Sequence, residues 1–90
     1  MQPTVLIVDD DRAHLLALSK LLQANGYKAV TTDDGEEALV LFEEHAPDVV
    51  LLDAMMPGLD GLEVCTRLRT LPGGETVPIV ILTSLEDDAT

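Results

Sequence analysis

The stretch V-L-I-V-D-D-D at residues 5–11 decides the fold class, because four apolar residues end abruptly in three acids. Three of the apolar residues are β-branched, which favours a short strand covered on both faces. Helical spacing follows at once, with Leu15, Leu18 and Leu22 on one face. Asn25-Gly26 then provides a helix end, since glycine accepts the left-handed conformation. The sequence therefore predicts a strand followed directly by a helix.

This alternation of strand and helix continues along the chain. Apolar or half-polar runs at 27–32, 49–52 and 79–82 predict three further strands, and helical patterns occupy 38–46 and 62–71. Strands that alternate with helices form parallel sheets through right-handed crossovers. We therefore expect an α/β fold with a doubly wound parallel sheet; in the flavodoxin-like order 2-1-3-4-5, the first and third strands are neighbours.

The two later helices allow more detailed predictions. The apolar face of the second helix runs from Ala38 to Ala46, and Pro47 is expected to end it, because proline disfavours a helical residue before it. In the third helix, Leu62 and Val64 are expected to point inward.

Charge and composition narrow the classes of partner. Seventeen acidic residues against five lysines and arginines give the ninety-residue chain a net charge of −12. Nucleic acids and anionic membranes would be repelled, whereas a divalent cation would be attracted. One cysteine excludes a disulfide framework and a cysteine-based zinc site. No apolar run is long enough to cross a membrane and no signal peptide is evident, so we expect a cytoplasmic protein with no nucleic-acid or membrane partner.

Acidic residues follow two of the strands that should be neighbours in the sheet. Asp9 and Asp10 come after the first strand, Asp53 closes the third, and Thr83 follows the fourth. The carboxyl ends of parallel strands share one edge, so these side chains should meet in a cleft there. Oxygen ligands without His or Cys favour Mg²⁺, or Mn²⁺. A carboxylate beside such an ion can attack phosphorus and form an aspartyl phosphate.

Some of these residues also have plainer interpretations. An Asp before a helix is commonly an N-cap, and this applies to Asp10 or Asp11 taken alone. Asp53 is harder to dismiss, because no helix starts directly after it and Asp60 can cap the next one. His14 is expected to be a solvated residue on an exposed helix face.

Three sequence blocks together resemble the receiver domain of two-component response regulators. They are V-L-I-V-D-D-D at 5–11, D-V-V-L-L-D-A-M-M-P-G-L-D-G at 48–61 and V-P-I-V-I-L-T-S at 77–84. The middle block is the most specific, and the resemblance runs from Thr4 to the last residue. It implies a receiver domain over residues 1–90.

The resemblance also implies a metal site and an acceptor. Asp53 matches the phosphoacceptor and lies beside the metal, Asp10 matches the direct metal ligand, and Asp9 matches the acid that holds the metal partly through water. The backbone carbonyl of Met55 matches the position that completes the metal site. The implied ion is Mg²⁺, with Mn²⁺ possible.

The function implied by the resemblance is a phosphorylated switch. Thr83 matches the hydroxyl that turns toward the phosphoryl group, and Ser84 matches the small position that leaves room for it. Pro57 and Gly58 match the turn after the acceptor. A sensor histidine kinase or a phosphotransfer protein would donate the phosphoryl group, and an output domain or partner would read it. Such a domain is not a turnover enzyme.

One departure from the family pattern concerns the C-terminal part. The family has a fifth strand that ends in a lysine, and this sequence has no lysine after Lys28. The fifth strand and the last helices are therefore expected to be missing, as in a C-terminally incomplete domain. The strand at 79–82 would then form an apolar edge open to self-association.

Two other functions remain open from the residues. Without the lysine, the domain could be an interaction module that is not phosphorylated. A phosphatase with an aspartate nucleophile, of the haloacid-dehalogenase type, would need Thr or Val at the fifth position of Asp-x-Asp-x-Thr/Val. Here Asp9 and Asp11 supply the acids but Ala13 stands at that position, and Asp53 has no role.

Overall fold

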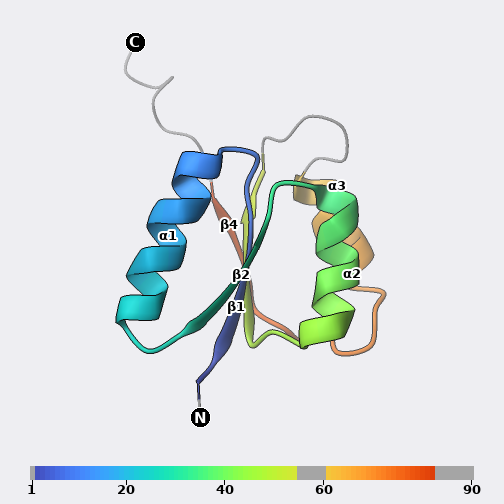
Figure 1. Ribbon diagram of the computed structural model, residues 1–90. Helices are drawn as coiled ribbons and strands as arrows, with labels where there is room; N and C mark the ends of the chain where they lie inside the picture. Colours follow the sequence, from blue (N-terminus) through green and yellow to red (C-terminus); the bar gives the residue numbers. More distant parts are fainter. Residues whose placement is uncertain (1, 55–60, 83–90) are drawn as a thin grey trace.

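Strands and helices alternate along the chain as the sequence predicts (Figure 1). The computed structural model describes residues 2–54 and 61–82. In chain order the elements are β1 (Thr4–Val8), α1 (Arg12–Ala24), β2 (Lys28–Thr32), α2 (Gly35–His45), β3 (Val49–Asp53), α3 (Gly61–Leu68) and β4 (Ile79–Leu82).

The four strands form one sheet in the order β2-β1-β3-β4, and every neighbouring pair is parallel. This confirms the expected α/β fold with strands 1–4 of the flavodoxin-like order. The described residues include no fifth strand. In the centre of the sheet, Val8 of β1 lies opposite Leu52 of β3. The residues that follow these two positions, Asp9 and Asp53, therefore emerge at the same level of the carboxyl edge.

Helices cover both faces of the sheet, with α1 on one face and α2 and α3 on the other (Figure 1). The α2–α3 face holds the larger core, in which strand residues such as Leu52 pack with Phe42, Val64 and Leu68. Phe42 is 3% exposed, and the other three side chains are fully buried. These contacts fix α3 against the end of β3.

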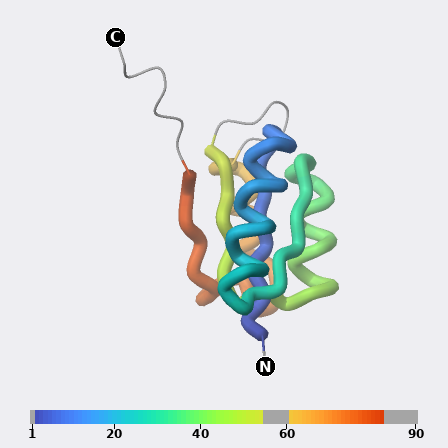
Figure 2. Tube along the Cα trace, turned by 60° about the vertical axis from the view of Figure 1, so that its left-hand side comes forward, coloured from blue at the N-terminus to red at the C-terminus, as the bar shows by residue number. Residues whose placement is uncertain are grey.

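The α1 face of the sheet is covered less completely. Leu15 packs against Val5 and Ile7 of β1, and α1 lies over the β1–β2 half of the sheet (Figure 2). On the other half, Leu51 is half-buried and Val80 of β4 is 47% exposed. The prediction that residues 79–82 form an apolar edge strand is confirmed for the described sheet.

The structure corrects two details of the predicted helices. The second helix ends at His45, where Ala46 takes a left-handed conformation with φ 45° and donates its N–H to the Phe42 carbonyl. Ala46 is exposed, so its predicted place on the apolar face is wrong. Leu62 is 64% exposed rather than buried, because Val64 occupies the core-facing side of α3. No described helix is long and apolar enough to span a bilayer.

Candidate metal and phosphoryl site

Three carboxylates converge at the carboxyl edge of the sheet, as the sequence predicts. Asp9 and Asp10 follow β1, and Asp53 is the last residue of β3. Each offers an oxygen, and these oxygens all lie within 4.8 Å of one another. The parallel pairing of β1 with β3 creates this cluster, since it brings both strand ends to one level.

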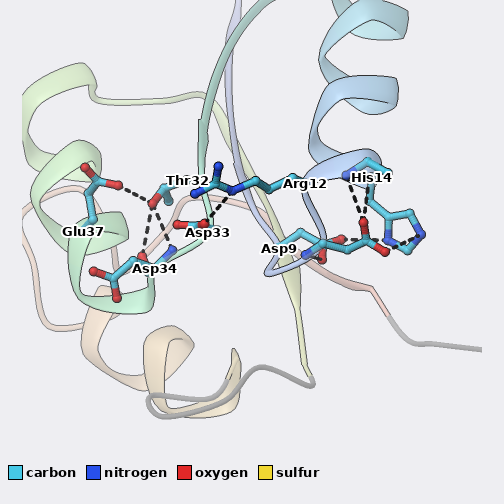
Figure 3. Close-up of polar contacts among 9 residues, drawn as sticks. Asp9, Arg12, His14, Thr32, Asp33, Asp34 and Glu37 are labelled. Carbon is cyan, nitrogen blue, oxygen red and sulfur yellow. Dashed lines mark hydrogen bonds and ion pairs between the residues drawn. The ribbon is translucent and has the colours of Figure 1, made fainter.

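The Asp9 side chain is buried and held from both sides. The residue is 3% exposed, and its N–H donates to the carbonyl of Thr32 at 3.1 Å. One carboxylate oxygen accepts the N–H of Asp11 at 2.9 Å, and the other lies 3.3 Å from Nδ1 of His14 (Figure 3). Both carboxylate oxygens of Asp9 therefore already have partners in the protein.

The His14 contact was missed by the sequence analysis. Its ring is 65% exposed, yet Nδ1 lies 3.3 Å from Oδ2 of Asp9 and Nε2 lies 3.6 Å from Oδ2 of Asp11. The solvated position expected for His14 is confirmed by that exposure, but its contact with the Asp9 carboxylate was not expected. The three-residue spacing from Asp11 was the available signal, because residues at that spacing share one helix face.

Asp10 and Asp11 have different surroundings although they are adjacent. Oδ1 of Asp11 accepts the N–H groups of Ala13 at 2.9 Å and His14 at 3.4 Å, so Asp11 is the N-cap of α1. Asp10 is exposed, and its carboxylate has no hydrogen-bond donor within residues 2–54 and 61–82. The cap interpretation thus holds for Asp11, and Asp10 stays available for a ligand.

The donor set fits a hard divalent cation. All three donors are carboxylate oxygens, the type that Mg²⁺ and Mn²⁺ prefer. Opposite ligands of one Mg²⁺ ion lie about 4.2 Å apart, because each bond is about 2.1 Å long. The spread of the three oxygens, at most 4.8 Å, is close to that size. No histidine or cysteine belongs to this group, which disfavours zinc.

A second polar network fixes the end of β2 beside the cluster. Thr32 is 4% exposed, and its hydroxyl donates to the Glu37 carboxylate of α2 and accepts the N–H of Asp34 (Figure 3). Arg12 of α1 forms an ion pair with Asp33 at 3.3 Å. These contacts connect α1 and α2 to the strand whose last carbonyl accepts the N–H of Asp9.

Several residues matched to the site by the resemblance lie outside the described residues. They are Met55, Pro57, Gly58, Thr83 and Ser84. Their assigned roles stay predictions.

Comparison with known proteins gives the family. The sequence model of the response regulator receiver domain matches residues 5–90. The chain belongs to the response regulator receiver family. It is 49% identical over 84 residues to response regulator MprA of Mycobacterium sp. (strain KMS), a match that covers 93% of this chain. That match spans 36% of the relative's length.

Solved structures support the same membership. A putative response regulator from Chloroflexus aurantiacus J-10-fl is 38% identical, with a TM-score of 0.89 over 97% of this chain and 71% of that chain. The chemotaxis protein CheY4 of Vibrio cholerae is 32% identical, with a TM-score of 0.88 over 98% of this chain and 76% of that chain. The fold is therefore the receiver fold at the level of backbone coordinates.

Family membership indicates which kind of site the acidic cluster is. Asp9, Asp10 and Asp53 form an acidic triad typical of the Mg²⁺ site of a receiver domain. A receiver domain implies a sensor kinase as its partner and is typically not a turnover enzyme.

Proposed function

We propose that this protein is the phosphoacceptor domain of a two-component response regulator, with Asp53 as the acceptor. The observation that carries the proposal is the position of Asp53, whose carboxylate closes β3 within 4.8 Å of Asp9 and Asp10 oxygens. Three carboxylates this close together raise the free energy of the folded state, because like charges repel at this distance. A bound cation would offset that repulsion and place a phosphoryl group beside Asp53.

The transfer step follows from the chemistry of a carboxylate. An oxygen of Asp53 attacks the phosphorus of a phosphohistidine or of a small acyl phosphate. The new bond joins phosphorus to the Asp53 oxygen, and the bond to the donor breaks with its electron pair staying on the donor atom. The product is an aspartyl phosphate, which acts as a regulatory mark.

The three acids of the cluster have different roles in holding the metal ion. Asp10 is the direct ligand of Mg²⁺ or Mn²⁺, since its carboxylate is exposed, and Asp53 is the second ligand. Asp9 holds the ion partly through water, because its oxygens are engaged by Asp11 and His14. When bound, the ion offsets the negative charge of the phosphoryl oxygens. By the family resemblance, the backbone carbonyl of Met55 would complete the ligand set.

The proposal extends to the switch, the partners and the location. Thr83 supplies the hydroxyl that turns toward the phosphoryl group, and Ser84 leaves space for it. A sensor histidine kinase or a phosphotransfer protein donates the group in a phosphorelay, and an output domain or partner responds. Residues 1–90 belong to the receiver domain. We place the protein in the cytoplasm, where response regulators typically act.

Mass spectrometry after incubation with acetyl phosphate and Mg²⁺ tests the acceptor. We expect one phosphoryl group per chain, removed by hydroxylamine and absent in Asp53→Asn. Asp33→Asn is the matched control, since Asp33 follows β2 at the same edge but pairs with Arg12. Label at a Ser, Thr or His, or label that persists in Asp53→Asn, would contradict the proposal.

The phosphatase alternative gives Asp53 no role, although the structure brings Asp53 into the acid cluster. An interaction module that is not phosphorylated remains the second candidate. Mg²⁺ binding without any phosphoryl adduct would favour that candidate.

A further inference from the structure

Gly61, the first residue of α3, packs against the backbone of the acceptor strand. It is buried, and its N–H donates to the carbonyl of Ala54 at 3.3 Å. A Cβ placed on Gly61 would lie 2.1 Å from the carbonyl oxygen of Asp53 and 2.6 Å from Cα of Ala54. Both contacts are with backbone atoms. Glycine is therefore required here by space, since any other residue would collide with the end of β3.

Moving α3 alone to make room for a side chain at position 61 would cost free energy. Val64 and Leu68 of α3 are fully buried in the core with Val50 and Leu52 of β3. Lifting the helix away from the sheet would expose these side chains to water. Because that exposure is unfavourable, we expect the end of β3 to take part of the displacement, which is about 1 Å for an acceptable contact.

We propose that Gly61 is a positioning residue for Asp53, a role that rests on the proposed acceptor function. The close approach of α3 sets the place of the Asp53 backbone and, through it, the distance of its carboxylate from Asp9 and Asp10. A methyl group at position 61 displaces the acceptor relative to the other two acids. Misplacement by about 1 Å can reduce a reaction rate about 100-fold.

The test compares Gly61→Ala with Gly74→Ala. Gly74 makes an equivalent close approach beyond the opposite end of α3, where a Cβ would lie 1.7 Å from the carbonyl oxygen of Leu68. Both variants place a methyl group against a backbone carbonyl, but only Gly61 contacts the acceptor residue. Both chains are kept folded with sucrose, which favours the compact state, and the folded fraction is measured by circular dichroism.

The readouts are the phosphorylation rate with acetyl phosphate and the Mg²⁺ dissociation constant from NMR shifts, both per folded molecule. We expect Gly61→Ala to lose at least about 10-fold in each, and Gly74→Ala to match the wild type. Equal values for the two variants would overturn the positioning role. A Gly61→Ala chain that stays unfolded while Gly74→Ala folds would also overturn it. If the wild type itself takes no phosphoryl group at Asp53, the acceptor function has failed instead.

Discussion

Replacing Asp11 should lower stability, whereas replacing Asp10 should weaken metal binding. Asp11 caps α1 through two backbone N–H groups, with its side chain 49% exposed. Loss of such a cap costs about 1 kcal/mol, within a range of about 0.5–2 kcal/mol. Asp11→Ala should therefore lower the unfolding free energy by about 1 kcal/mol. In a domain of this size, that corresponds to a fall of about 4–8 °C in melting temperature.

Asp10→Ala should keep the stability of the domain but lose its affinity for Mg²⁺. Asp10 caps nothing, and its carboxylate lies in the cluster with Asp9 and Asp53. Removing one of three like charges reduces repulsion, so this variant should be at least as stable as the wild type without metal. It should lose most of its affinity for Mg²⁺, because a direct ligand has gone.

Urea denaturation, with EDTA and then with Mg²⁺, measures both effects. An ion at ten times its dissociation constant stabilises the folded state by about 1.4 kcal/mol. We expect this gain in the wild type and in Asp11→Ala, and a much smaller gain in Asp10→Ala. Equal gains in the two variants, or an Asp10→Ala protein that is less stable than the wild type in EDTA, would refute the reasoning.

Three further predictions concern charge, the α3–β4 connection and the sheet edge. Asp53→Asn should raise the unfolding free energy in EDTA by roughly 1 kcal/mol. At 4.8 Å, the upper limit of the separations between the clustered oxygens, two like charges repel by about 0.9 kcal/mol in water and about 3.5 kcal/mol at an effective dielectric of 20. Mg²⁺ should narrow the stability difference, as measured by calorimetry. Arg69→Ala should cost about 1–2 kcal/mol in urea denaturation, because Nη1 donates to the carbonyls of Gly74 at 2.9 Å and Val77 at 2.7 Å; Arg69→Lys should restore part of it. Light scattering should show association that grows with protein concentration. The association should weaken in Val80→Lys, because a charge on β4 disfavours pairing of this edge strand with a second chain. A chain that is monomeric at every concentration would contradict this prediction.

The sequence by itself determined the order of elements and the meeting of the acids. Apolar runs alternating with helical patterns are local signals, and they are read from neighbouring residues. Once the sheet is parallel, the residues that follow its strands must share one edge, and in the expected strand order the first and third strands are neighbours. The approach of Asp9 to Asp53 was therefore predictable without coordinates, and so was the cap at Asp11, which bonds only to residues two and three positions ahead.

Only the tertiary structure decided which neighbours these residues have. Leu62 and Val64 are both apolar, but the rotation of α3 against β3 buries Val64 and leaves Leu62 exposed. The need for glycine at position 61 depends on how closely that helix approaches the Asp53 carbonyl. Each of these features depends on the packing of elements in space, which the local pattern of the sequence does not contain.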